Sequence, residues 1–364
     1  MKIKDITACI EAFAPLKTQE SYDNSGLIIG HPESGTERAL ICLDVTEAVI
    51  NEAIEKQCDL IISHHPLIFG GIKKINGFSM NERIIIKAIQ EKIAIYAAHT
   101  NLDAAYNGVN HILAERLGVK NLSLLQPAKD QLKKLVVFCP TDHAEKVRDA
   151  LFLAGAGHIG NYDSCSFNID GTGTFRARGN AKPFVGKLDE LHREEEIRIE
   201  TIFPFYLQPR VVQAMLKAHP YEEVAYDIYS LDNLNPLNGI GVVGELDEAL
   251  AWEEWVQIVK KNLMLEGIKH SPKIKNNVKR IALCGGSGSF LIPSAIAANA
   301  DVFLTADLKY HSFFEAENRI MLIDAGHYET EQFAKELLFR VVKEKFTTFA
   351  VLISATDTNP VRYA

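Results

Sequence analysis

Two adjacent histidines, His64 and His65, end an apolar run of the chain and precede Pro66. Imidazole is the commonest metal-binding side chain and changes charge near neutral pH. Neighbouring residues of a strand face opposite sides, so two histidines that serve one site require the chain to turn, and a proline suits a turn. A lone histidine is usually a satisfied polar group. For this pair, a metal-binding or catalytic role weighs as much as a structural one.

Two later apolar runs also end in residues that can bind a metal. The run 92–98 is followed by His99 and Asp103, and the run 319–323 by Asp324, His327 and Glu331. In open α/β sheets the ligand crevice lies beyond the carboxyl ends of the strands, so we expect these residues to meet at one site. His327 and Glu331 are four residues apart and would share one face of a helix.

The types of these residues indicate which metals would suit them. Imidazole together with carboxylate is a donor set for zinc, iron or manganese. The six cysteines show no CxxC spacing, and none accompanies these residues. The pattern therefore predicts an open, catalytic kind of metal site and not a structural, cysteine-rich zinc site.

The first 127 residues alternate strand and helix signals, which predicts a layered α/β lobe. We expect strands at 39–43, 60–62 and 94–98, and helices at 47–56, 81–92 and 109–117. Thr46 is the expected cap of the first helix, and Gly118 is the expected end of the last.

The pattern changes over residues 128–235. We expect strands at 132–138, 162–169, 173–178, 197–203 and 224–231, and helices at 144–154 and 209–218. This order predicts an inserted ferredoxin-like α+β domain, with a turn-rich linker at 232–239. A second α/β lobe over 236–364 would complete the metal site, with strands at 278–284 and 302–305 and helices at 253–262 and 328–345.

Composition limits the kinds of partner. A net charge of -8 argues against non-specific nucleic-acid binding, which uses a basic surface. No stretch approaches a membrane span, and charged residues interrupt any N-terminal signal sequence. Several cysteines lie in apolar runs, so we expect buried thiols in a reducing compartment, the cytoplasm.

Six segments resemble motifs of the dinuclear-metal-centre hexameric proteins named GTP cyclohydrolase 1 type 2 homologs. They occur in the family's order along the whole chain. They are Ser21–Leu27, Cys42–Thr46, Ser63–Pro66, His99–Asp103, Thr305–His311, and Gly326–His327 with Glu331. Ala306 departs from the glycine that is more frequent there. The middle segment resembles the insert of longer bacterial members, which is similar to PII-type signalling proteins.

The resemblance implies two divalent metal ions per chain and a homohexamer. His64 and Asp103 would bind one metal, His65 and His327 the other, and Glu331 would bridge both. A metal-dependent hydrolase is the leading expectation, with GTP cyclohydrolase chemistry or the hydrolysis of another nucleotide or phosphoester. The alternative is a metal-binding regulatory or scaffold protein, whose PII-like insert binds a small ligand or a partner.

Other polar residues keep two interpretations each. His99 could orient a ligand or act as a general base. Asp307 and His311 could reach a substrate or cap a helix. Asp44 could orient a ligand, and Asp23 could simply form a turn. Residues 285–289, Gly-Gly-Ser-Gly-Ser, could bind phosphate, although a tight turn is the simpler interpretation. The acidic run 194–196 is expected on a solvated face.

Overall fold

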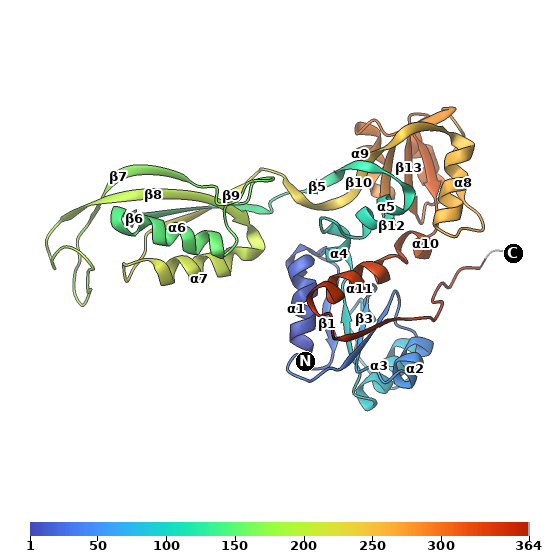
Figure 1. The fold of residues 1–364 in the computed structure, drawn as a ribbon, viewed down its shortest axis with the longest axis horizontal. Helices are drawn as coiled ribbons and strands as arrows, with labels where there is room; N and C mark the ends of the chain where they lie inside the picture. The colour runs from blue at the N-terminus through green and yellow to red at the C-terminus, as the bar shows by residue number, and fades with distance from the viewer. Residues whose placement is uncertain (363–364) are drawn as a thin grey trace. The chain divides into compact units, whose positions relative to one another are not determined.

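The computed structural model describes residues 1–362 of the chain. It has a mixed α/β fold that divides into two compact units. The first unit comprises Met1–Pro127 and the chain from Leu237 onward, and the second comprises Ala128–Pro236. The second unit is the green-to-yellow part of Figure 1. Within residues 1–362, no helix is both long and apolar enough to cross a membrane.

The first sheet of unit 1 has five strands. In spatial order they are β1 (Gly26–Ile29), β4 (Ala94–Ala97), β3 (Leu60–Ser63), β2 (Arg38–Cys42) and β15 (Ala350–Ile353). All neighbours are parallel except β1 and β4. Strand β3 is buried along its whole length because its alternate residues enter two different hydrophobic clusters. Burial on both faces explains why its sequence is a continuous apolar run.

The second sheet of unit 1 has six strands. In spatial order they are β11 (Lys269–His270), β14 (Met321–Asp324), β13 (Val302–Ala306), β12 (Asn277–Ser287), β10 (Asn235–Ala251) and β5 (Lys120–Ala128). The central strands β12, β13 and β14 are parallel. Strand β5 comes from the first half of the chain, whereas β15 of the first sheet comes from its end. Each sheet of unit 1 thus combines both halves of the sequence.

Nine α-helices accompany these sheets in the described part of unit 1. They are α1 (Ile3–Phe13), α2 (Glu47–Glu55), α3 (Met80–Gln90), α4 (Thr100–Ala104), α5 (Val109–Leu117), α8 (Trp252–Asn262), α9 (Ile292–Ala297), α10 (His327–Glu331) and α11 (Ala334–Lys345). Both expected helix ends are confirmed. The Thr46 hydroxyl accepts a bond from the Val49 amide, and Gly118 ends α5 at φ 70°.

Unit 2 contains one antiparallel sheet with two helices on one face (Figure 1). Its elements are β6 (Leu132–Pro140), α6 (Ala144–Leu153), β7 (Phe167–Phe175), β8 (His192–Pro204), α7 (Gln208–Ala218) and β9 (Tyr226–Leu231). Strand order β7-β8-β6-β9 and this element order are those of a ferredoxin-like unit. Alternate residues of β6, Leu135 and Val137, face the two helices and form the core with them.

Two sequence predictions about strands were wrong. The proposed linker 232–239 lies largely within β10, because Gly239 allows a close approach to another strand and does not mark a turn. A Cβ at Gly239 would lie 2.4 Å from the Gln126 carbonyl oxygen. In place of the two strand pieces 162–169 and 173–178, the structure has one strand, β7, which pairs continuously with β8 from Phe167 to Phe175.

The predicted helix 328–345 is interrupted. The structure has α10 and α11 instead, separated by Gln332 and Phe333. Both residues keep right-handed helical angles, but the Glu336 amide donates to the Phe333 carbonyl at 3.0 Å, three residues away. This tighter turn ends the regular helix just after Glu331.

Glu52 of α2 forms hydrogen bonds with the segment 354–356, which follows β15 of the first sheet. Its carboxylate accepts bonds from the Ser354 hydroxyl, the Ala355 amide at 2.8 Å and the Thr356 hydroxyl at 2.6 Å. Burial opposes the charge, but these bonds and Lys56 outweigh burial and lower the pKa of Glu52 to about 2. The carboxylate therefore stabilises the fold when it is ionised.

We expect Glu52→Gln to destabilise unit 1 by about 2 kcal/mol at pH 7, because hydrogen bonds to a charged acceptor are lost. The pKa is lowered by folding, so the stabilisation is complete above the unfolded value near 4.5 and is lost as pH falls toward 2. Urea unfolding of both chains at several pH values should show a gap that closes on acidification. A gap that is unchanged at pH 2 would contradict this origin.

Candidate metal centre

The chain turns at His64 and His65, as the sequence predicts. Both amides donate to consecutive carbonyls at the end of β2, His64 to Cys42 at 3.2 Å and His65 to Leu43 at 2.9 Å. A regular strand would offer only alternate residues to one neighbour. The departure from strand geometry directs both imidazoles to the same side, and their ring centroids lie 4.9 Å apart.

His64 presents an unpaired nitrogen inside the protein. Its side chain is fully buried, and Nδ1 lies 2.8 Å from the carbonyl oxygen of Ala98. A carbonyl only accepts, so Nδ1 carries the proton and Nε2 of the neutral ring is a free lone pair. Nε2 lies 3.5 Å from Oδ1 of Asp103, and neither atom has a hydrogen-bond partner within residues 1–362. Buried polar atoms without partners are costly, so these two atoms fit the donor atoms of a metal site.

Glu331 occupies the centre of the cluster. Its Oε2 lies 2.9 Å from Nε2 of His65, 2.9 Å from Nε2 of His327 and 3.8 Å from Nε2 of His64. Helix α10 carries both His327 and Glu331, one turn apart, which is the shared face expected from their spacing. One buried carboxylate thus reaches the ligand atoms of three histidines.

In His65 and His327, the ring nitrogen that faces away from Glu331, Nδ1, lies beside a carboxylate. Nδ1 of His65 lies 2.7 Å from Asp44, and Nδ1 of His327 lies 2.7 Å from Asp307. Such pairs fix the ring orientation and leave Nε2 free to bind a metal, and they make the imidazole a stronger donor. Asp307 adopts a left-handed conformation, φ 56°, to make its contact.

The glycine-rich run makes room for the central carboxylate. Gly286 has φ 61°, and a Cβ there would lie 2.1 Å from Oε1 of Glu331. The Gly285 amide donates to Asn110 at 2.9 Å and the Gly286 amide to Thr330 at 3.0 Å. These amides are therefore used within the fold, which disfavours the phosphate-binding interpretation of this run.

The carboxylates of the cluster stabilise the positively charged, protonated forms of His65 and His327. Burial opposes protonation of His65, but Asp44 and Glu331 outweigh it and raise its pKa to about 10. Burial is likewise outweighed at His327, where Glu331 and Asp307 raise the pKa to about 9. Burial raises the pKa of Asp103 to about 6, although His64 opposes the change, while the histidines hold the pKa of Glu331 well below its usual value.

Three groups of ligand atoms in the described chain are close enough to hold a metal ion. They are His64 with Asp103 and Glu331; His65 with His327 and Glu331; and His64 with His65 and His99. Glu331 belongs to two of the groups. The unpaired His64 Nε2, the space left by Gly286 and the mixed imidazole and carboxylate donors all fit a bound divalent cation.

The Duf34/NIF3 (NGG1p interacting factor 3) family matches residues 1–360. This chain belongs to that family. A Bacillus subtilis (strain 168) relative named GTP cyclohydrolase 1 type 2 homolog is 40% identical over 366 residues, covering 99% of this chain and 98% of the relative. A relative of the same name from Staphylococcus aureus (strain MSSA476) is 36% identical over 370 residues, with 100% of both chains covered.

Solved structures share the fold of this NIF3-family chain. The crystal structure of a Bacillus cereus protein related to NIF3 has a TM-score of 0.87 and 40% sequence identity, and covers 100% of this chain and 99% of that one. A Staphylococcus aureus structure has a TM-score of 0.79 and 32% identity over the same shares. The family resemblance and the mixed α/β fold expected from the sequence are confirmed.

The weaker candidate residues of this NIF3-family chain have different surroundings. The Asp307 side chain contacts His327 and does not cap a helix. The sequence interpretation did not include this contact. His311 is exposed, and its ring contacts are with Tyr310 and Phe314. His99 Nδ1 lies 2.8 Å from Asp23, and its ring lies against those of His64 and His65.

Asp23 was expected to form only a turn, and Thr358 was not singled out from the sequence. Asp23 has a fully buried side chain and accepts bonds from the Asn24 and Thr100 amides as well as contacting His99, so it does more than form a turn. These contacts outweigh burial and lower its pKa far below the usual value. The Thr358 hydroxyl donates to Asp44 at 2.7 Å. No spacing rule connects Thr358 to Asp44, which lies 314 positions earlier. For Asp23, the only signal in the sequence was the tripeptide Asp-Asn-Ser that it begins.

Proposed function

We propose that this chain binds two divalent metal ions and uses them as a hydrolase. His64 and Asp103 would hold one ion, His65 and His327 the other, and Glu331 would contact both. The observation that carries the proposal is the position of Glu331 Oε2, within 3.8 Å of three imidazole nitrogens from both halves of the chain. Bound there, a pair of divalent ions supplies Lewis acidity that lowers the pKa of water and offsets negative charge developing on a substrate.

Carboxylates around the histidines keep the donor set in place. Asp44 and Asp307 hold the Nδ1 protons of His65 and His327, so the rings cannot rotate away when the substrate enters. The Thr358 bond to Asp44 continues this support into the C-terminal segment. Site geometry that is fixed beforehand reduces the reorganisation required during reaction.

His99 is the residue we assign to proton transfer. Asp23 holds Nδ1 of its ring, which leaves Nε2 directed toward the same space as His64 and His65. Its side chain is 15% exposed, so a substrate or water can reach it. An imidazole held by a buried carboxylate can accept a proton and be stabilised in its charged form.

Two exposed aromatic side chains lie on the His99 side of the site. Tyr22 is 63% exposed and Phe69 is 51% exposed, with ring centroids 6.2 Å apart. Phe69 also lies 5.7 Å from the His99 ring. Aromatic side chains at this position can stack on a planar ring. A purine nucleotide is therefore the substrate class we favour, and the relatives' name makes GTP the first one to test.

Turnover by metal-loaded protein tests the proposal. Zinc-, iron- or manganese-loaded chain should consume GTP with release of formate, or hydrolyse a nucleotide or simple phosphoester with release of phosphate. His65→Ala should abolish the activity because it removes a ligand, whereas His311→Ala, which changes an exposed side chain, should retain it. Equal rates for wild type and His65→Ala would mean contaminating activity and would overturn the assignment.

A further inference from the structure

Unit 2 contains a cavity of about 720 Å³ that lies entirely within residues 138–225. This volume falls in the range that small-molecule sites in proteins occupy. The cavity lies along β7 and the extended segment that follows it, and β8 and the loop after α7 also contribute to it. None of the residues of the metal centre belongs to unit 2, so the cavity is independent of the proposed hydrolase function.

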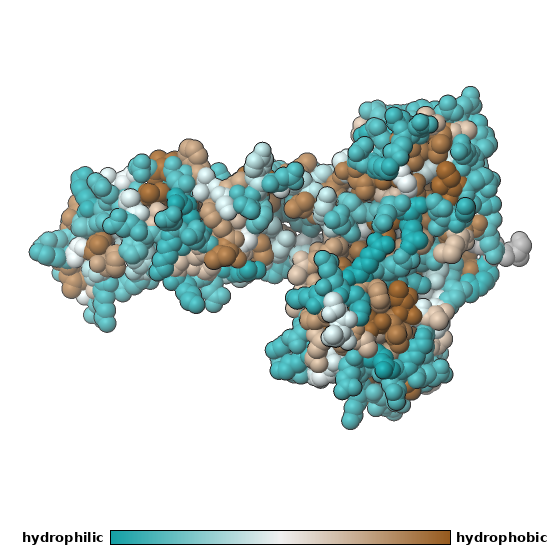
Figure 2. Space-filling model, in the orientation of Figure 1, coloured by the Kyte–Doolittle hydropathy of each residue, from teal (hydrophilic) through white to brown (hydrophobic). Residues whose placement is uncertain are grey.

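One side of the cavity is aromatic. The Tyr221 ring lies between two phenylalanines, 6.0 Å from the Phe175 centroid and 6.3 Å from that of Phe184. Phe138 lines the cavity as well. Phe184 is 52% exposed, and apolar patches are visible among the hydrophilic surface of this unit (Figure 2). Ring faces that are accessible in a cavity favour a planar ligand.

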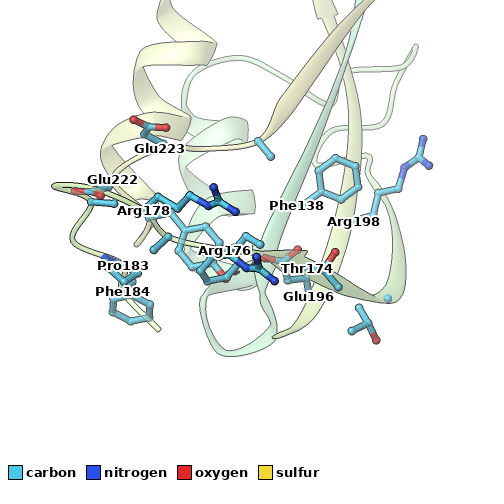
Figure 3. A pocket seen from close by; sticks show the side chains of 18 of the residues that line it. Phe138, Thr174, Arg176, Arg178, Pro183, Phe184, Glu196, Arg198, Glu222 and Glu223 are labelled. Carbon is cyan, nitrogen blue, oxygen red and sulfur yellow. Dashed lines mark hydrogen bonds between the residues drawn. The ribbon is translucent and has the colours of Figure 1, made fainter. Parts of the chain in front are cut away.

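Two arginines supply positive charge without a protein partner. Arg176 and Arg178 are alternate residues of an extended segment, so their side chains leave the backbone on the same side. Figure 3 shows both guanidinium groups directed toward the middle of the cavity-lining residues. Neither group has an ion pair or hydrogen bond with any residue in 1–362. Arg198, by contrast, is paired with Glu200 at 2.8 Å.

Four acidic residues also line the cavity, Asp170, Glu196, Glu222 and Glu223, and the carboxylate of Glu196 is held as a hydrogen-bond acceptor. The Tyr221 hydroxyl donates to Oε1 of Glu196 at 3.0 Å. Glu196 pairs with Gly171 of β7, and its side chain extends over Gly173, where a Cβ would be 2.1 Å from Oε2. Any larger residue at Gly173 would clash with the Glu196 side chain. The acidic run 194–196 is therefore not simply a solvated face, because one of its members lines the cavity.

We propose that unit 2 binds a small molecule of the nucleotide class, with a planar ring and a phosphate group. Arg176 and Arg178 bind the phosphate, because guanidinium groups match its oxygens in bidentate geometry. The ring stacks against the wall formed by Phe184 and Tyr221. Glu196 accepts a hydrogen bond from a hydroxyl or amino group of the ligand.

Calorimetric titration of the full chain tests this site with three probes: adenosine 5′-monophosphate, adenosine and inorganic phosphate. We expect the monophosphate to bind more tightly than either fragment, because it alone engages both the arginines and the aromatic wall. Replacing both arginines, in R176A/R178A, should weaken its binding by roughly tenfold or more for each charge removed. Arg193→Ala removes an exposed arginine of β8 outside the cavity and should leave binding unchanged.

Two further measurements separate this site from the metal centre and from misfolding. Phe184→Ala should weaken the monophosphate but leave the response to inorganic phosphate unaltered. His65→Ala, in the metal centre, should leave the affinity for the monophosphate unaltered. Undiminished binding in R176A/R178A, or adenosine that binds as tightly as its phosphate, overturns the proposal. Inorganic phosphate that binds as tightly as the monophosphate overturns it as well.

Discussion

Glu331→Gln is expected to remove both metal ions from the protein. The amide keeps the shape of the side chain but loses the charge shared by His64, His65 and His327, whose Nε2 atoms lie within 3.8 Å of one oxygen. Loss of an outer hydrogen-bond partner alone weakens metal binding by about 10- to 100-fold, so loss of a shared ligand charge should exceed about 100-fold. Equilibrium dialysis against zinc or manganese, followed by elemental analysis, measures the effect.

Glu329→Gln is the matched control. Glu329 is buried in the same short helix and accepts a bond from Asn359 at 2.9 Å, but it belongs to none of the three ligand groups. This variant should keep its metal. If Glu331→Gln loses only one equivalent, the carboxylate is not shared between two ions. If the control loses as much metal as Glu331→Gln, the effect comes from disruption of α10.

His99→Ala should slow turnover by about 100- to 10,000-fold, the usual contribution of a general base, while most of the metal is retained. The ring touches the histidine cluster, yet the other ligand groups provide donors without it. The rate would be measured on whichever substrate the wild-type protein consumes, alongside metal content. Asp23→Asn should reproduce part of the loss, because the carboxylate that holds Nδ1 of His99 is then replaced by an amide.

Metal content decides between two roles for His99. If the alanine variant loses metal in proportion to activity, His99 is a ligand, as its place in the third ligand group allows. Retained metal with an unchanged rate would exclude both roles. Retained metal with a slow rate is the result we expect.

The sequence was informative for potential metal ligands that come soon after the end of a strand. His64 and Asp103 follow β3 and β4 of the first sheet, and His327 follows β14 of the second. Within each sheet, residues that follow parallel strands gather at the carboxyl-end edge. Glu331 could be placed with His327 because a spacing of four is set by helix geometry alone. These positions depend on local periodicity, which a single sequence displays.

Residues whose partners are distant in sequence could not be assigned in this way. Thr358 reaches Asp44 only because β15 pairs with β2, a parallel contact between the two ends of the chain. Gly286 resembles an ordinary turn residue until Glu331 approaches it. Gly173 was expected to begin a strand, but it lies inside β7, where the Glu196 side chain packs against it. A glycine in sequence does not reveal whether it permits a turn or a close contact.

The number of metal ions bound per chain tests the central claim most directly. Gently purified protein, saturated with zinc, iron or manganese and freed of excess metal, should contain about two equivalents by elemental analysis. Anomalous diffraction from crystals of this material should then place two peaks beside Glu331, one near His64 and one near His65. A single peak, or metal bound away from Glu331, would contradict a dinuclear centre in this chain.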